Sequence, residues 1–260
     1  MHPRHVREEV IALVAVGHND CEVSRRTGIP RPTVRDWRWT EEAEAGLRNP
    51  SRRRKTMKAS ETCWRCWQPT TPIYIDPALY CELLGLYLGD GHISQLARTQ
   101  RIRLFLDSKY DGIVKEAEAI LEVTFPFNRV QRQIRHEGAM TVLTIYSQHI
   151  ACLFPQHGPG KKHDRDVRLE GWQWQAVFRS PGALLRGLIF SDGCSFVNHT
   201  DNRKYAYPSY QFANLSGDIL KVFCSACDLL GVRYRRYATS IRINRRESVA
   251  IMHQHVGVKS

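Results

Sequence analysis

The 260-residue sequence contains 42% hydrophobic residues, which is enough to build a buried core and excludes a disordered chain. Lys and Arg outnumber Asp and Glu by 38 to 26, so the formal net charge of +12 favours a polyanionic partner such as nucleic acid. No apolar run reaches the roughly 18 to 20 residues that cross a bilayer, and the charged start lacks a signal-type apolar stretch. We therefore expect a cytoplasmic protein with no membrane partner, associated with the nucleoid when bound to DNA.

Residues 1–45 show the pattern of three short helices. Val6, Val10 and Leu13 share one helical face, a cap at Asn19 or Asp20 opens a second helix, and a Gly-Ile-Pro turn precedes a third. The stretch "EVSRRTGIPRPTVRDWRW" resembles the second and third helices of transposase-like and regulator-like DNA-binding modules. This resemblance implies a small all-α helix-turn-helix domain whose last helix enters the major groove. The residues expected to face bases and phosphates are Arg31, Thr33, Arg35 and Arg38. The alternative is a three-helix bundle that binds a different partner.

Residues 46–78 contain a basic run and almost no apolar side chains to bury, which indicates a basic linker. Cys63 and Cys66 form a CxxC pair, half of the four ligands that structural Zn²⁺ requires, so zinc here is an open alternative to free thiols. Cys224 and Cys227 form a second CxxC, but apolar residues at helical spacing surround them and favour buried core cysteines. In a chain without an export signal we expect free thiols rather than disulfides.

An internal repeat organises the remainder of the chain. The segments "LLGLYLGDG" at 83–91 and "LRGLIFSDG" at 185–193 align without a gap, and a similar amphipathic helix follows each of them. The segments "QHGPGK", ending at Lys161, and "QHVGVK", ending at Lys259, close the two copies. Alternating strand patterns lie between these markers. Each copy therefore predicts the order helix, hairpin, helix, hairpin, helix.

The two nonapeptides match the LAGLIDADG pattern, and residues 79–260 resemble a single-chain LAGLIDADG (DOD-type) homing endonuclease. The resemblance implies an α+β fold in which two pseudo-symmetric αββαββα halves, residues 79–180 and 181–260, form a saddle over double-stranded DNA. It also implies a monomer with an internal pseudo-twofold axis. Because little sequence follows Lys259, we expect the last helix of the second half to be short or absent.

The residues of the repeated motif suit two helices in close contact. Gly85 and Gly89 in the first copy, and Gly187 and Ser191 in the second, are four residues apart and share one helix face, so two backbones can approach there. Each helix is expected to end at an Asp-Gly pair, with the glycine as a left-handed cap.

Asp90 and Asp192 occupy the ends of these two helices. A carboxylate there faces the negative end of the helix dipole, so stability alone disfavours it. Two such helices in contact would bring both carboxylates together, and a divalent cation with oxygen ligands, Mg²⁺ or Mn²⁺, would relieve their repulsion. The alternative is an ordinary Asp-Gly turn after a buried helix, which the recurrence of the pair at the matched position disfavours.

The family resemblance implies a metal-dependent endonuclease that hydrolyses one phosphodiester per DNA strand and leaves short 3′ overhangs. Lys161 and Lys259 match the position of a basic residue that polarises water or the scissile phosphate, with Lys162 as an alternative to Lys161. All three lysines could instead anchor phosphates. The metal-binding groups that the resemblance implies are the carboxylates of Asp90 and Asp192 and the neighbouring backbone oxygens of Gly89 and Ser191.

The strand patterns offer alternating polar side chains that suit the major groove, because a β ribbon shows every second residue to the bases. Arg and Gln are suited to guanine and adenine edges, whereas a merely solvated face would normally contain more Glu and Lys. The candidate DNA-binding residues are Arg101, Arg103, Arg129, Gln131, Gln133 and Arg135 in the first copy, and Arg236, Arg242 and Asn244, which alternate with Ser240, in the second.

Two other functions fit the same sequence. A transcription regulator could keep the scaffold and the helix-turn-helix without nuclease activity, although such regulators tend to lose the motif acids that this chain keeps. A maturase could use the same surface to hold intron RNA, whereas intron homing requires the nuclease. An intein is disfavoured because the chain lacks the nucleophile and terminal asparagine that splicing needs.

Overall fold

The computed structural model describes residues 3–44, 75–126, 128–200 and 205–259. The chain divides into two compact units, residues 1–58 and 59–260. Most of the predicted linker, including Cys63 and Cys66, lies outside the described residues, so its boundaries and its zinc site stay predictions. Within the described ranges, no helix is both long and apolar enough to span a membrane.

The described part of the first unit consists of α1 (Arg4–Ala15), α2 (Asp20–Thr27) and α3 (Arg31–Glu44). The side-chain oxygen of Asn19 caps α2 by accepting hydrogen bonds from the backbone N–H groups of Cys21 and Glu22, at 3.0 and 3.1 Å. Gly28 then turns the chain with a left-handed φ of +68°. The core of the unit is formed by Val10, Val23, Ile29 and Val34. The three predicted helices and their turn are confirmed.

The second unit contains the predicted repeat. Its first half comprises α5 (Pro77–Asp90), β1 (Gly91–Gln95), β2 (Gln100–Asp107), α6 (Asp111–Thr124), β3 (Gln131–Arg135), β4 (Met140–Ser147) and α7 (Ile150–Leu153). Helix α8 (Gly171–Arg179) leads to the second half. That half comprises α9 (Pro181–Asp192), β5 (Gly193–Thr200), β6 (Tyr205–Ala213), α10 (Gly217–Leu229), β7 (Arg235–Arg236), β8 (Ser240–Ile243) and α11 (Arg246–His255).

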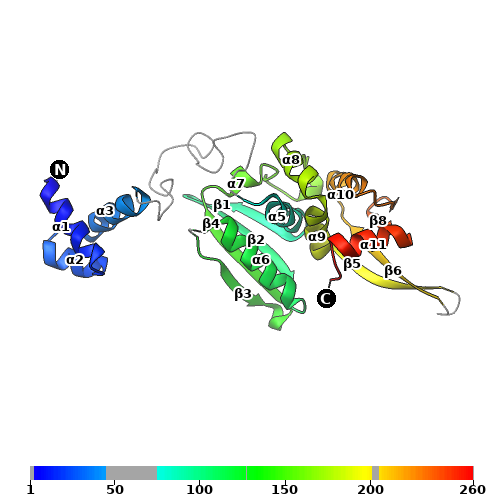
Figure 1. The fold of residues 1–260 in the computed structure, drawn as a ribbon, viewed down its shortest axis with the longest axis horizontal. Helices are drawn as coiled ribbons and strands as arrows, with labels where there is room; N and C mark the ends of the chain where they lie inside the picture. The colour runs from blue at the N-terminus through cyan, green and yellow to red at the C-terminus, as the bar shows by residue number, and fades with distance from the viewer. Residues whose placement is uncertain (1–2, 45–74, 127, 201–204, 260) are drawn as a thin grey trace. The chain divides into compact units, whose positions relative to one another are not determined.

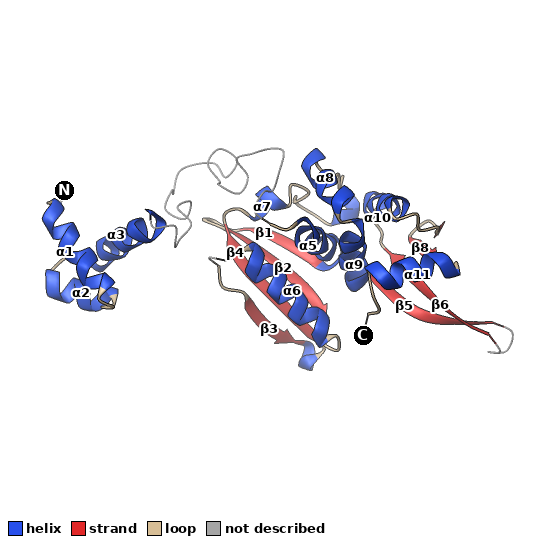
Figure 2. Cartoon of the chain, viewed as in Figure 1, coloured by secondary structure: helices blue, strands red, loops and turns tan. Residues whose placement is uncertain are grey.

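Each half builds one antiparallel four-stranded sheet, in the order β1-β2-β4-β3 and β5-β6-β8-β7. The identical order confirms the predicted pair of αββαββα halves. In the first half, α6 lies across β2 and β4 (Figure 2). Buried Ile102, Leu104 and Leu106 alternate along β2 with the more exposed Arg101 and Arg103, so one face of the sheet packs on helices and the other bears the polar side chains.

The expectation of a short or absent last helix is wrong. Helix α11 has 10 residues, whereas its counterpart α7 has 4. Val249, Met252 and Val256 are buried and spaced three and four residues apart, so α11 and the residue after it present one apolar stripe to the core. This packing stabilises the helix although the described residues end only four residues after His255.

Helices α5 and α9 lie side by side at the centre of the second unit (Figure 1). Residues Tyr80 to Leu88 of α5 are all buried, and α9 is buried over most of its length. A helix that is apolar on all sides is expected where every side packs against protein. The two motif helices therefore form the interface between the halves.

Candidate active site and nucleic-acid interface

The two motif helices approach each other at their glycines. A Cβ atom on Gly85 would lie 2.6 Å from the carbonyl oxygen of Leu184, and one on Gly187 would collide with the carbonyl oxygen of Glu82. Gly89 faces Ser191, whose hydroxyl donates to the carbonyl oxygen of Gly187 at 2.9 Å. The predicted close helix contact is therefore present and depends on residues without bulky side chains.

Asp90 and Asp192 are the last residues of α5 and α9. The prediction that glycine forms a left-handed cap after them is wrong, because Gly91 and Gly193 have φ of −88° and −113° and enter β1 and β5 directly. Glycine is needed there for close approach, since a Cβ at Gly91 would lie 2.5 Å from the Cα of Tyr87. Each acid is thus held at a junction between helix and strand.

The two acids influence each other electrostatically. Burial and, after it, the charge of Asp192 raise the pKa of Asp90 to about 6, against the opposing charges of Lys259 and Lys162. Burial also raises the pKa of Asp192, while a hydrogen bond from Asn214 Nδ2 at 2.6 Å lowers it. Asp192 Oδ2 would lie 3.2 Å from a Cβ on Gly89, the residue before Asp90. The predicted meeting of the two acids at the helix ends is confirmed by this proximity.

Lys162 and Lys259 place their ammonium groups at equivalent points beside the acids. Lys162 Nζ donates to the carbonyl oxygens of Gly89 at 2.8 Å and Leu88 at 3.0 Å, and Lys259 Nζ donates to that of Ser191 at 2.9 Å. Lys161 is exposed, so Lys162 occupies the place predicted for Lys161. Burial lowers the pKa of Lys162 to about 8, although the charges of Asp192 and Asp90 oppose this shift.

The donor set fits a hard divalent cation. Two carboxylates and two backbone carbonyls offer only oxygen atoms, which Mg²⁺ and Mn²⁺ accept. The carbonyls of Gly89 and Ser191, predicted as metal ligands, already accept hydrogen bonds from ammonium groups, which shows that cations are stabilised at this point. No cluster of three or more His, Cys, Asp or Glu side chains with metal-binding geometry occurs in the described ranges.

A cavity of about 780 Å³ opens beside Asp192. One wall is basic, with Lys161, Lys162, His163 and Arg165 from the segment that follows α7. Burial lowers the pKa values of two further lining residues, His92 and His157, which favours their neutral form. Asn214 also lines the cavity. The combination of basic groups and acids in one cavity suits a phosphate that must be bound together with a cation.

The outer face of the first sheet carries most of the predicted DNA-binding residues. Arg101 and Arg103 contact Ser94 at 3.3 Å and His92 at 3.4 Å, on the neighbouring strand β1. Arg135 donates to Gln133 at 2.8 Å, which confirms that these two share a face of β3. The register opposes Gln131 to Thr144, which in turn opposes Arg103, so Gln131 belongs to this face as well. Arg129 is exposed and precedes β3.

The second sheet requires one correction. Arg242 Nε donates to Gln211 at 3.1 Å on the outer face, and its partner across β7 is Arg235. Arg236, which was predicted for this face, opposes the buried Ile241 and therefore lies on the opposite side of the sheet. The two-residue strand β7 offers no alternation from which its register could be read. Asn244 follows β8 and is exposed.

In α3, the predicted DNA-contacting residues differ in their surroundings. Arg31 and Arg35 are exposed, and Thr33 is partly buried near the start of the helix. Arg38 donates to Asp20 at 3.1 Å and so bridges α3 to α2. This ion pair indicates that Arg38 also stabilises the unit itself.

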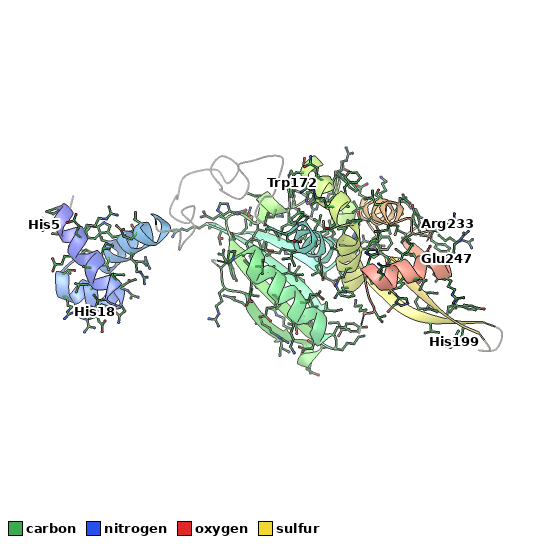
Figure 3. All side chains as sticks on the ribbon, viewed as in Figure 1. His5, His18, Trp172, His199, Arg233 and Glu247 are labelled. Carbon is green, nitrogen blue, oxygen red and sulfur yellow. The ribbon has the colours of Figure 1, made fainter. Side chains whose placement is uncertain are left out.

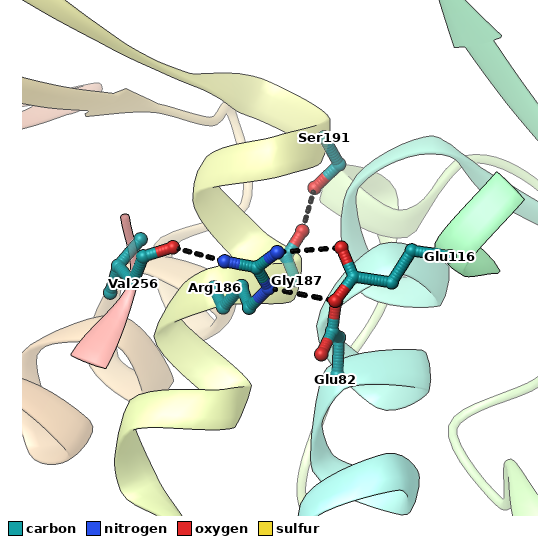
Figure 4. Close-up of polar contacts among 6 residues, drawn as sticks. All are labelled: Glu82, Glu116, Arg186, Gly187, Ser191 and Val256. Carbon is teal, nitrogen blue, oxygen red and sulfur yellow. Dashed lines mark hydrogen bonds and ion pairs between the residues drawn. The ribbon is translucent and has the colours of Figure 1, made fainter. Parts of the chain in front are cut away.

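Sequence reasoning missed a charged cluster between the halves (Figure 4). Arg186 of α9 donates to Glu82 at 3.2 Å and to Glu116 at 2.6 Å, on α5 and α6, and to the carbonyl oxygen of Val256 at 2.6 Å. Burial and the charge of Glu116 raise the pKa of Glu82 to about 7, against the effect of Arg186. Arg186 thereby connects three helices with the segment that carries Lys259.

The first unit is similar to a known protein family. Residues 6–48 match the family model described as a Homeodomain-like domain. No curated protein sequence matches the chain.

Three solved structures are similar to part of this chain. Mesophilic variants of the homing endonuclease I-DmoI share 16% identity over 69% of this chain and 96% of that chain, with a TM-score of 0.49. I-DmoI in complex with DNA and Mn shares 14% identity over 70% and 97% of the two chains, with a TM-score of 0.48. Full-length WhiA from Thermatoga maritima shares 15% identity over 72% and 58%, with a TM-score of 0.44. By its own element order and sheet order, the second unit consists of two αββαββα halves joined by the paired motif helices, which is the architecture that the LAGLIDADG resemblance implies.

Proposed function

We propose that this chain is a site-specific endonuclease for double-stranded DNA that hydrolyses one phosphodiester per strand with divalent metal held by Asp90 and Asp192. One observation carries the proposal. Two carboxylates lie at the ends of two helices in backbone contact, and a partly buried ammonium group lies beside each. A carboxylate at a helix C-terminus lowers the stability of the fold. A function that needs two paired acids therefore explains Asp90 and Asp192 better than a structural role does.

The residues around the acids have distinct tasks in this proposal. A bound Mg²⁺ or Mn²⁺ would activate water and polarise the scissile phosphate. Asp90 and Asp192 hold the cation, and Asn214 orients Asp192 through its hydrogen bond. Lys162 and Lys259 counter negative charge on the phosphate, because each ammonium lies where the acids and the helix carbonyls converge.

Double-stranded DNA fits the rest of the second unit as substrate. The outer face of the first sheet presents Arg101, Arg103 and Gln133, and that of the second sheet presents Gln211 and Arg242. Such a face matches the donor and acceptor pattern of the major groove. The net charge of +12 adds attraction to the phosphates at every sequence.

The test uses the full chain, a randomised duplex library and Mg²⁺, with sequencing of the cut ends. Wild-type protein should produce a defined staggered cut. Asp90→Asn and Asp192→Asn should abolish double-strand cleavage and retain DNA binding. Asp166→Asn is the matched control, since the side chain of Asp166 is 78% exposed and pairs only with Arg168 among the described ion pairs. Cleavage that persists in either motif variant would overturn the assignment.

A DNA-binding regulator without nuclease activity is a second candidate, favoured by one observation. The carbonyls of Gly89 and Ser191 are already neutralised by Lys162 and Lys259, so the helix ends are stable without a metal ion. The same library distinguishes the two candidates. A regulator would enrich bound, intact duplexes in Mg²⁺, whereas a nuclease would enrich cut ends.

A further inference from the structure

The second sheet continues outward as a two-stranded ribbon. β8 opposes only Tyr210–Ala213 of β6, but the pairing of β5 with β6 extends from Phe196 opposite Ser209 to Thr200 opposite Tyr205. Figure 1 shows this hairpin reaching past the other strands of its sheet. Figure 3 places His199 far out along it. In the first sheet, β1 has 5 residues and its pairing with β2 has no such extension.

The register defines which side chains face outward on the ribbon. Paired residues share a face and alternate along each strand. Gln211 belongs to the outer face because it binds Arg242 there, and Cys194 opposes it. Two residues further along β5 comes Phe196, and two further again comes Asn198, opposite Tyr207. Phe196, Asn198 and Tyr207 therefore continue the face that carries Gln211 and Arg242.

The ribbon carries three large side chains that are partly exposed. Phe196 is 36% and Tyr207 49% exposed on the outer face, and Val197 is 52% exposed on the opposite face. An isolated two-stranded hairpin is marginally stable in water, and clustered exposed apolar groups mark contact surfaces. Because the same face is continuous with Gln211 and the basic Arg242 and Arg235, its occupant is the duplex that these residues bind.

We propose that Phe196, Asn198 and Tyr207 read A·T base pairs in the major groove, with the two rings against thymine 5-methyl groups and the Asn198 amide on adenine. This inference rests on the proposed recognition of double-stranded DNA. The chemistry follows from the groove, where the thymine methyl is an apolar contact and adenine offers an acceptor and a donor to Asn. Phe196, Asn198 and Tyr207 then determine specificity for the half of the DNA target that the second sheet contacts.

The two halves of the target then differ in composition. The outer face of the first sheet carries Arg101, Arg103 and Arg135, which suit guanine. Phe196 and Asn198 lie three and five residues beyond Gly193, and strands rise about 3.3 Å per residue. At about 3.4 Å per base pair, Phe196 and Asn198 should therefore contact base pairs that lie about three to five positions outward from the catalytic centre. The thymines should fall in this window, on the second-repeat side only.

The experiment measures binding of the full-length Asp192→Asn variant, which is expected not to cleave, to the duplex selected from a randomised library. Each thymine is replaced in turn by deoxyuridine, which removes one methyl group and keeps every Watson–Crick partner. Within the window, uridine should weaken binding about fourfold, the ratio expected for one methyl-sized apolar group. The added Phe196→Ala change should remove this uridine effect at the position it reads.

Val197→Ala is the matched control, because Val197 lies on the same ribbon with its side chain on the opposite face. It should retain the full uridine effect. A selected duplex without thymines in the window, or with thymines insensitive to uridine, overturns this inference and leaves the proposed nuclease intact. A duplex that shows the uridine effect but is never cut by the wild-type chain supports the inference and overturns the nuclease instead.

Discussion

The Nζ atom of Lys162 donates a hydrogen bond to the carbonyl oxygen of Gly89 at 2.8 Å, directly before Asp90 at the end of α5. The ammonium thus compensates the negative end of a helix that also carries a carboxylate. Lys259 makes the equivalent bond to Ser191 at the end of α9. Lys162 follows α7 and Lys259 follows α11, so the two lysines come from corresponding points of the two halves and the repeat has the same electrostatic arrangement at both helix ends.

The first prediction separates Lys162 from its neighbour Lys161. Lys162→Met should lower the cleavage rate about 100-fold, because it removes the positive charge that lies beside Asp90 and Asp192, where the proposed reaction develops negative charge. Lys161→Met should change the rate by less than about threefold, since Lys161 is exposed and an exposed charge is screened. Single-turnover cleavage of a plasmid that carries the selected site measures both. Equal losses in the two variants would contradict the structural assignment and indicate general phosphate attraction.

The sequence was sufficient to predict the internal repeat and the two motif acids. It was not sufficient to predict the positions of side chains that depend on how strands pair or on contacts between distant segments. Gly85 and Gly187 each lie four residues before a second small residue on the same helix face, and apolar and basic side chains alternate along β2. These regular spacings are visible in the sequence, so the helix contact and the polar face of the sheet could be predicted. The choice between Arg235 and Arg236 depends on how β7 pairs with β8, which two residues cannot reveal. Asn214 reaches Asp192 only because the end of β6 returns beside α9, and no local signal marks it.

The second prediction tests the helix contact. Gly85→Ala or Gly187→Ala should lower the free energy of unfolding by about 2 to 4 kcal/mol, because the added methyl group overlaps backbone atoms that cannot move without separating the helices. Gly112→Ala is the control, since a Cβ at Gly112 in α6 meets nothing within 4 Å. It should be neutral or stabilising by up to about 1 kcal/mol. Urea unfolding followed by circular dichroism measures all three; similar effects in all of them would show that helix propensity, not contact, decides.

The third prediction concerns the pH dependence of stability through Glu82. Its pKa is about 7 in the folded chain against an ordinary 4.5, so the folded state keeps a proton that the unfolded state releases. The contribution of Glu82 to stability is therefore full below about pH 4.5 and is lost as the pH rises to about 7. Burial is the main cause of the shift.

In Glu82→Gln this loss cannot occur, while the Gln side-chain oxygen can still accept from Arg186. The free energy of unfolding of the variant, relative to wild type, should therefore increase by up to about 3 kcal/mol between pH 4.5 and pH 8. Urea unfolding curves at several pH values measure the difference. Parallel stability profiles for the two proteins would show that Glu82 titrates in its ordinary range.

The fourth prediction concerns Arg186, whose removal leaves two glutamates unpaired between the halves. Arg186→Met should cost about 1 to 3 kcal/mol of unfolding free energy, because it leaves the mostly buried Glu82 and the partly exposed Glu116 without their cationic partner. The surface arginine Arg132, which pairs with Asp111 and Glu118, is the matched control, and Arg132→Met should cost at most about 1 kcal/mol. Adding Glu116→Gln to Arg186→Met should restore part of the loss, since it removes one of the stranded charges. If the double variant is as unstable as Arg186→Met alone, the loss comes from packing or from the freed Val256 carbonyl, and the charge cluster is not what holds the halves together.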